Sequence, residues 1–368
     1  MKIKKKIVKN INGLNYFILE AGDFKLKKSN AILFLHGFPE LSYSYRHLIK
    51  LFSKIGYYCI APDQRGYGRT SLIDNIKDFK KNYSIINLTK DIYLLLKSLK
   101  ISKVNLVGHD FGSYVACFFG LIYPKLSSSI VIMSMPFSGT QLRKNKGFNI
   151  KKINKNLNAL RPAKKHYQLY LSGKSANNNI MNCSQGISKF LRSYYYFKSY
   201  DFDGNKPHKL KNYSTKELKK MPEYYIMKNN LGISQTVSKY MPSKAYVKEC
   251  AWLTEKDLNI FSNSFKNTSF KGPLSWYGMM LDEKEKQQIL DLNLSRKIFI
   301  PALFVAGEAD WGIFQKPGDL IKMEKEFFNN YYGTKIIKKA GHWVQQEKPK
   351  ETFKVINSFY KKIRKSED

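Results

Sequence analysis

The chain has 368 residues, of which 43% are hydrophobic and 14% aromatic, enough for one large catalytic core with an insertion but too few for three ordinary domains. The formal net charge of +36 could indicate a nucleic-acid partner, but the lysines are spread over the whole sequence, so we interpret them as solvated surface and expect no nucleic acid. No run reaches about 18 apolar residues, so no membrane span is expected, and the four scattered cysteines show no metal-site spacing.

The N-terminal part of the chain predicts strands joined by helices into a mostly parallel sheet. Residues 1–6 are basic, but the segment behind them is too polar for an export signal, so we expect a cytoplasmic protein with free thiols. Apolar runs that end in turn residues predict strands, and apolar residues at helical spacing predict a helix. The predicted strands are 31–35, 57–61, 104–107 and 129–133, and the predicted helix is 88–99.

The middle of the chain has a different character. From residue 139 the strand pattern stops, and a segment rich in Tyr, Asn and Lys has helix-like pieces at 188–196 and 216–229. Strand patterns return at 298–305 and 334–337, and a helix is predicted at 351–362. We therefore predict an α/β fold whose core comprises 1–138 and 281–368, with a mainly helical cap inserted at 139–280.

One short segment predicts the reacting group. Gly108-His109-Asp110-Phe111-Gly112 follows a predicted strand and begins a predicted helix. Small flanking residues permit the sharp turn that exposes a nucleophile above a sheet. Here the central residue is Asp110, and a carboxylate that attacks an sp3 carbon forms an alkyl ester, which water must then hydrolyse. His109 is interpreted as a spacer within this turn, and His36 as a residue that shapes its own turn.

Hydrolysis of an ester requires a base. Asp310 and His342 also follow predicted strands, and the chain order nucleophile, acid, histidine is that of a known type of triad. His342 would activate water while Asp310 orients it. The backbone N–H groups of Phe38 and Phe111 are candidates for stabilising the oxyanion. We predict no metal and no cofactor.

Six segments are distinctive: His36-Gly37-Phe38-Pro39-Glu40, Asp63-Gln64-Arg65-Gly66-Tyr67-Gly68, Gly108-His109-Asp110-Phe111-Gly112, His166-Tyr167-Gln168-Leu169-Tyr170, Gly272-Pro273-Leu274-Ser275-Trp276-Tyr277 and Gly341-His342-Trp343. Together they resemble the soluble epoxide hydrolase family of α/β-hydrolases. The resemblance implies an α/β-hydrolase fold, an epoxide substrate and water as reactants, and two cap tyrosines, Tyr167 and Tyr277, that bind the epoxide oxygen and protonate it. It also suggests a cis peptide at Phe38-Pro39. Pro39, Trp276 and Trp343 lie in these motifs and are expected to line the substrate pocket.

Other functions use a similar set of residues. A haloalkane or haloacid dehalogenase forms the same aspartyl ester but needs side-chain N–H donors for the halide, or arginines for a carboxylate. Phe38 and Phe111 offer neither. Many family members carry Trp after the nucleophile, where this chain has Phe111. A non-catalytic receptor on a hydrolase scaffold is the remaining alternative, and the presence of groups for both chemical steps argues against it.

Overall fold

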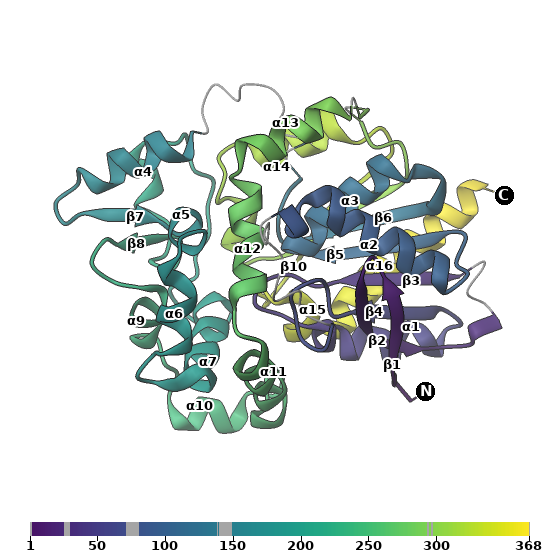
Figure 1. Cartoon of the computed structure of the whole chain (residues 1–368), viewed down its shortest axis with the longest axis horizontal. Coiled ribbons are helices and arrows are strands. Elements are labelled where there is room, and N and C mark those ends of the chain that lie inside the picture. Colours follow the sequence, from purple (N-terminus) through teal and green to yellow (C-terminus); the bar gives the residue numbers. More distant parts are fainter. Residues whose placement is uncertain are drawn as a thin grey trace.

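An eight-stranded sheet forms the centre of the molecule (Figure 1). The computed structural model describes residues 2–25, 30–70, 81–137, 139, 149–292, 294–295 and 297–367. The strand order in the sheet is β1-β2-β4-β3-β5-β6-β9-β10. The strands are β1 (Lys4–Ile11), β2 (Leu14–Ala21), β3 (Ala31–Leu35), β4 (Tyr58–Pro62), β5 (Val104–His109), β6 (Ser127–Met133), β9 (Ala302–Gly307) and β10 (Tyr331–Ile337).

The first two strands form an antiparallel hairpin that the sequence analysis did not predict. β1 pairs with β2, and β2 pairs antiparallel with β4. Asn12 and Gly13 form the turn, and both have positive φ (49° and 80°). Asn-Gly is the preferred pair for such a two-residue hairpin turn. The signal was therefore present in the sequence, within a segment that was considered only as a possible export signal.

The remaining strands pair in parallel. The edge strand β10 is only partly buried, whereas β3, β4, β5, β6 and β9 are buried on both faces. Alternate residues of β3 point to opposite sides, because Ile32 and Phe34 belong to one buried cluster and Leu33 and Leu35 to the other. α1 (Arg46–Lys54) and α16 (Pro349–Glu367) cover the first face, and α2 (Ile85–Ser98) and α3 (Phe111–Ile122) cover the second. Coverage on both faces explains why these strands are continuous apolar runs.

Between β6 and β9 the chain leaves the sheet and builds a mainly helical layer at one end of it (Figure 1). Two short strands, β7 (Lys164–His166) and β8 (Ile226–Lys228), pair within this layer. The helices of the layer are α4 (Ile150–Asn158), α5 (Tyr167–Leu171), α6 (Ser175–Met181), α7 (Gly186–Lys198), α8 (Thr215–Leu218), α9 (Ile233–Ser238), α10 (Lys244–Glu249), α11 (Glu255–Thr268) and α12 (Lys271–Met280). The next helix, α13 (Glu283–Asp291), lies against the core near α14 (Asp319–Lys322), where Glu285 accepts the N–H of Ile85 (Figure 1).

One predicted helix of this layer was wrong. The segment 216–229 contains only the short α8, followed by a turn and by β8. Pro222 stands between them, and a proline in a helix interior removes a hydrogen bond and clashes with the preceding turn. The limits predicted for the cap, 139 and 280, stay predictions, because residue 138 lies outside the described residues. At its other limit, α12 ends at Met280.

The C-terminal elements return to the sheet. The predicted strand 298–305 starts later than expected, at Ala302, and only an isolated bridge forms at Ile298. Short helical elements follow β9 and β10: η5 (Trp311–Ile313), α14 (Asp319–Lys322), η6 (Met323–Phe327) and α15 (Val344–Glu347). Within the described ranges, no helix is both long and apolar enough to cross a membrane.

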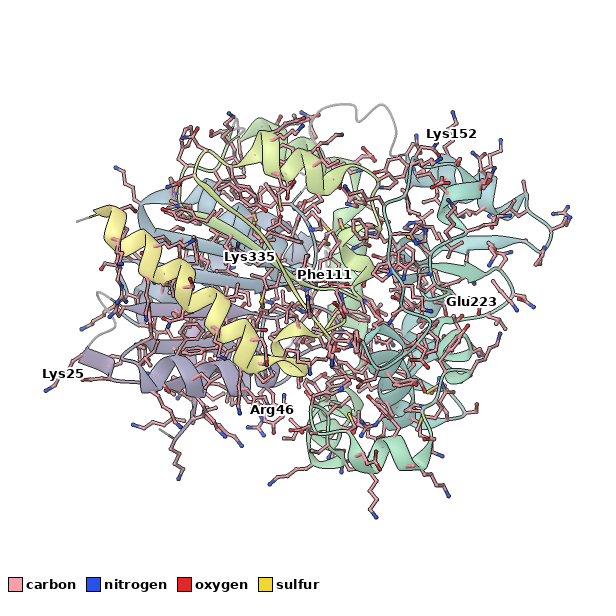
Figure 2. The ribbon with its side chains drawn as sticks, turned by 180° about the vertical axis from the view of Figure 1, so that it is seen from behind. Lys25, Arg46, Phe111, Lys152, Glu223 and Lys335 are labelled. Atoms are coloured by element: carbon pink, nitrogen blue, oxygen red, sulfur yellow. The ribbon has the colours of Figure 1, made fainter. Side chains whose placement is uncertain are left out.

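The positive charge is distributed over the surface. In Figure 2, Lys25 and Lys152 project at opposite ends of the molecule, whereas Phe111 lies deep between the sheet and the helical layer. Both lysines are exposed. The arrangement agrees with the interpretation of the lysines as solvated surface.

Candidate active site

Asp110 lies on the sharp turn between β5 and α3. Its backbone has φ 51° and ψ −119°, a conformation that L-residues rarely adopt. The turn is tight, because a Cβ on Gly108 would collide with the backbone of Gly112, and a Cβ on Gly112 would collide with the carbonyl of Leu35. The two glycines therefore allow the elbow to form, and the strained residue at its tip carries the carboxylate.

His342 and Asp310 meet this carboxylate from neighbouring strand ends. The His342 Nε2 atom lies 3.6 Å from Asp110 Oδ2, and its Nδ1 atom lies 3.0 Å from Asp310 Oδ1. The backbone N–H of Gly312 also donates to Asp310 Oδ1, at 2.7 Å. Within the part of the chain that the structure describes, the buried Nε2 of His342 has no hydrogen-bond partner. The arrangement leaves this nitrogen available to a water molecule near Asp110.

Electrostatics favours a neutral His342 beside an ionised Asp310. Burial and the charge of Lys198 lower the pKa of His342, although Asp310 opposes them. Burial alone would raise the pKa of Asp310, but His342 and hydrogen bonds, among them that of Gly312, lower it below its usual value. An imidazole that is neutral near pH 7 can accept a proton, which a base must do.

One of the two predicted oxyanion donors contacts the carboxylate, and the other begins the helix behind it. The N–H of Phe38 donates to Asp110 Oδ1 at 3.1 Å, and the peptide bond between Phe38 and Pro39 is cis, as expected. Phe111 is the first residue of α3, and the N–H groups of a helix's first turn have no partner inside the helix. The end of a helix that carries such groups also favours negative charge.

Two tyrosines of the helical layer face the elbow. The ring of Tyr277, in α12, lies 4.7 Å from that of Phe111 and 6.0 Å from that of Tyr167, centroid to centroid. The Tyr167 hydroxyl donates to Gln315 Oε1 at 2.7 Å and accepts a hydrogen bond from Gln168 Nε2 at 3.2 Å. Burial raises the pKa of both tyrosines, so both remain protonated and able to donate a proton.

The three predicted pocket residues have defined positions. Trp343 is fully buried, and its ring lies 4.6 Å from that of His342. Its indole N–H donates to the carbonyl of Tyr195, whose hydroxyl in turn donates to the carbonyl of Pro39 at 2.7 Å. Trp276 donates its indole N–H to the carbonyl of Arg65 at 3.2 Å. The indole N–H groups of both tryptophans are therefore engaged with main-chain carbonyls.

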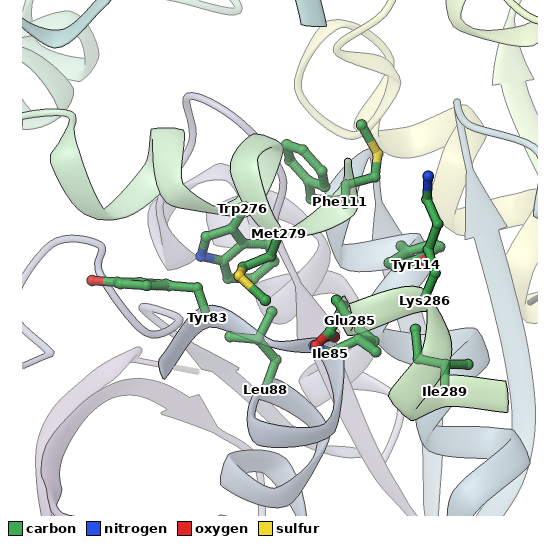
Figure 3. A pocket seen from close by; sticks show the side chains of 11 residues that line it. Tyr83, Ile85, Leu88, Phe111, Tyr114, Trp276, Met279, Glu285, Lys286 and Ile289 are labelled. Atoms are coloured by element: carbon green, nitrogen blue, oxygen red, sulfur yellow. The ribbon is translucent and has the colours of Figure 1, made fainter. Parts of the chain in front are cut away.

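Trp276 and Phe111 line a small cavity (Figure 3). Its volume is about 30 Å³, which suits about one water molecule and excludes a substrate. Glu285 lines it as well; burial raises the pKa of Glu285 to about 7. The other lining residues are Tyr83, Ile85, Leu88, Tyr114, Met279, Met280, Lys286 and Ile289.

The interpretation of His109 as a mere spacer was wrong. His109 Nδ1 lies 2.6 Å from Glu40 Oε2, and both side chains are fully buried. Burial would lower the pKa of His109, but Glu40 raises it; His109 in turn lowers the pKa of Glu40 to about 2, against the effect of burial. The pair is therefore charged. The pair also binds the backbone of the active-site loops. His109 Nε2 donates to the carbonyl of His342 at 2.7 Å, and Glu40 accepts the N–H of Gly37.

Ser134 was also missed. It follows β6, is fully buried, has φ 74°, and places its Oγ 2.8 Å from His342 Nδ1. Neither its burial nor its contact with His342 leaves a pattern in the sequence, since serine after a strand is most often a turn residue. His36, in contrast, agrees with its structural interpretation: its Nε2 accepts the N–H of Gln64 at 3.1 Å.

Comparison with known proteins identifies the family of the chain. A family model described as alpha/beta hydrolase fold matches residues 30–349. The chain belongs to the alpha/beta hydrolase family. Among its relatives, epoxide hydrolase B of Mycobacterium tuberculosis is 29% identical over 336 residues, which cover 89% of this chain and 90% of that protein. Epoxide hydrolase 3 of Siraitia grosvenorii is 25% identical over 377 residues, covering 96% of this chain and 97% of that protein.

Solved structures of epoxide hydrolases are similar in fold to this hydrolase. The crystal structure of epoxide hydrolase A from Mycobacterium thermoresistibile has a TM-score of 0.75 and 25% identity, and covers 97% of this chain and 98% of that one. A laboratory evolved variant of potato epoxide hydrolase has a TM-score of 0.76 at 25% identity, and covers 98% of this chain and 100% of that one. The predicted fold class is thereby confirmed.

Proposed function

We propose that this hydrolase converts an apolar epoxide into a vicinal diol through a covalent ester on Asp110. The observation that carries the proposal is a carboxylate on the elbow that faces an imidazole nitrogen for which the described residues offer no hydrogen-bond partner. Two buried phenols pack close to the same elbow. The relatives described above support it, because they are named epoxide hydrolases and their similarity to this chain extends over nearly their full lengths.

In the first step a carboxylate oxygen of Asp110 attacks one carbon of the epoxide, and the bond from that carbon to the ring oxygen breaks. The departing alkoxide is strongly basic, so a phenol with a raised pKa can still protonate it. Tyr167 and Tyr277 are the proposed donors. In the free enzyme the Tyr167 hydroxyl donates to Gln315, so it exchanges this acceptor for the epoxide oxygen when substrate binds.

In the second step His342 takes a proton from water, and the resulting hydroxide attacks the carbonyl carbon of the Asp110 ester. We assign Oδ2, which faces His342, as the ester oxygen, and Oδ1, which already accepts the Phe38 N–H, as the oxygen that becomes the oxyanion. The N–H of Phe111 is the proposed second donor. When the tetrahedral intermediate collapses, the bond between the Asp110 carboxyl carbon and Oδ2 breaks, and the diol leaves with Oδ2. The imidazolium, which Asp310 stabilises, gives its proton to the departing alkoxide, and the proton of the new Asp110 carboxyl group restores the phenol that was ionised in the first step.

A dehalogenase remains the alternative, and two observations argue against it. The indoles of Trp276 and Trp343 donate to main-chain carbonyls and are not free to solvate a halide. The relatives described above are named epoxide hydrolases.

The direct test is a substrate panel. Purified enzyme is incubated with apolar epoxides and with chloro- and bromoalkanes of matched size, and diol and halide are quantified, with Asp110→Ala as the inactive control. We expect diols from epoxides and no halide. Halide release without diol formation would overturn the proposal. We also propose a cytoplasmic location, which the four free cysteines support.

A further inference from the structure

Lys198, the last residue of α7, carries a buried ammonium beside the catalytic histidine. The residue is only 5% exposed. Its Nζ atom lies among four aromatic rings at similar distances, which form a cage around it. The distances to the ring centroids are 5.4 Å for Tyr194, 5.5 Å for Tyr224, 5.5 Å for Tyr225 and 5.3 Å for Trp343.

The charge of this ammonium is not neutralised by direct contact. Among the residues that the structure describes, no carboxylate forms an ion pair with Lys198. Buried charges are normally paired, since desolvation is costly. Ring faces attract a cation without cancelling its charge. Burial lowers the pKa of Lys198, but Asp110, Asp310 and Glu40 act on it from beyond contact distance and oppose that effect. These carboxylates favour the protonated form of Lys198, which places a positive charge in this region.

The same residue contacts the backbone of His342. The carbonyl of Lys198 accepts the His342 N–H at 2.9 Å, and the ring of Trp343, the next residue in the chain, is one wall of the cage. The cage also borders the active site, because Tyr194 packs on Phe38 and Tyr225 on Tyr167. Lys198 thus joins the helical layer to the loop that carries the base.

We propose that Lys198 is a positioning residue that keeps His342 in its neutral, proton-accepting form for hydrolysis of the ester. A positive charge nearby makes a second positive charge on the imidazole less favourable. This inference rests on the proposed function and assigns to the helical layer a part in the second chemical step, in addition to its tyrosines. The groups that face His342 are Asp110 at the elbow, His109 with Glu40, Ser134 after β6, Asp310 after β9, Lys198, and Glu347, which accepts the N–H groups of Gly341 and Trp343.

The two half-reactions separate this role from a structural one. Ester formation does not need His342, whereas ester hydrolysis does. The Trp343 ring lies 5.3 Å from the Lys198 Nζ atom and 4.6 Å from the His342 ring, so the charge is at most about 10 Å from the imidazole. In single-turnover experiments between pH 5 and 9, Lys198→Met is expected to move the acid limb of ester hydrolysis upward by about one pH unit, the effect of a charge at that distance with an effective dielectric constant of about 20. Lys198→Arg keeps the positive charge and should return the acid limb of ester hydrolysis to its wild-type pH. Lys189→Met, at an exposed position of the same helix, is the matched control.

Several results would overturn the proposal. One is an acid limb of ester hydrolysis that Lys198→Met leaves at the wild-type pH, and another is an equal shift of that limb in Lys189→Met. The third is a loss of rate that is the same at every pH and that Lys198→Arg does not restore. A defect seen only with substrates that carry a carboxylate would instead assign Lys198 to substrate binding. If Lys198→Met does not fold, Lys198→Gln takes its place.

A second measurement does not depend on activity. Histidine labelled with ¹³C in the imidazole is titrated by NMR in wild type and Lys198→Met, and His342→Gln identifies the signal. The His342 midpoint should rise in Lys198→Met, and equal midpoints would refute the inference. If no epoxide reacts at all, the proposed function fails while this titration still decides the role of Lys198.

Discussion

Replacing Glu40 by Gln changes a buried carboxylate that contacts four donors around the site. Its Oε2 atom faces His109 Nδ1 at 2.6 Å and the N–H of Gly37 at 3.1 Å, and its Oε1 atom accepts from the side-chain amides of Gln345 and Gln346 at 2.7 and 3.2 Å. A carboxylate can accept from all four donors. An amide has one accepting oxygen, so in either orientation its NH₂ group meets two other donors.

The expected cost is large. Removing one partner of a buried ion pair destabilises a protein by about 3 to 5 kcal/mol, since the other charge is left unpaired. Urea unfolding of Glu40→Gln at pH 6 measures it, and Glu249→Gln, at an exposed position of α10, should change stability by no more than about 0.5 kcal/mol. His109→Gln in the Glu40→Gln background should add less than it costs alone, because the pair is already broken.

The effect also has a pH signature. The pKa of Glu40 is lowered from 4.5 to about 2, so its contribution is present above pH 4.5 and is lost as the pH falls toward 2. The pKa of His109 is raised above 6.5, so its contribution is present below pH 6.5 and is lost as the pH rises through the raised value. The difference between wild type and Glu40→Gln should therefore be largest between pH 4.5 and 6.5. A cost below about 1 kcal/mol throughout that range would refute the charged pair.

Three further predictions concern chemistry and the elbow. The double variant Tyr167→Phe, Tyr277→Phe should slow ring opening by roughly 100- to 10,000-fold in stopped-flow experiments, and an unchanged rate would remove both tyrosines from the mechanism. Ester hydrolysis should reach half its maximal rate below pH 6.5, because the pKa of His342 is lowered from that value; a midpoint above it contradicts a neutral base. Gly112→Ala should unfold or severely destabilise the protein in thermal melts, whereas Gly278→Ala, which meets open space, should not; equal melting temperatures would show that the elbow tolerates a side chain.

Much of the core could be predicted because its pattern is local. The strand 31–35 was predicted with its observed limits, since a strand covered by helices on both faces is an uninterrupted apolar run. The residues after the strand ends could be found for a related reason: the carboxyl ends of parallel strands meet at one edge of a sheet, so Asp110, Asp310 and His342 were expected together. In the structure His342 lies between the two carboxylates, 3.6 Å from Asp110 and 3.0 Å from Asp310.

The features that were missed depend on packing between distant parts of the chain. Glu40 and His109 are 69 residues apart, and neither residue type is usually buried without a partner. The cage around Lys198 combines three tyrosines of the helical layer with Trp343 of the core, and no periodicity links them. Tyr167 and Tyr277 could be chosen among 25 tyrosines only through motifs, because a reactive phenol and a packed one look alike in a sequence.

The covalent ester on Asp110 is the central claim, and trapping it is the most direct test. His342→Gln removes the base for hydrolysis and leaves the nucleophile in place. After incubation with an epoxide that wild type converts, we predict that a peptide containing Asp110 gains the mass of the whole epoxide and that little diol forms. Diol formation by His342→Gln at the wild-type rate, with no modified peptide, would contradict the account.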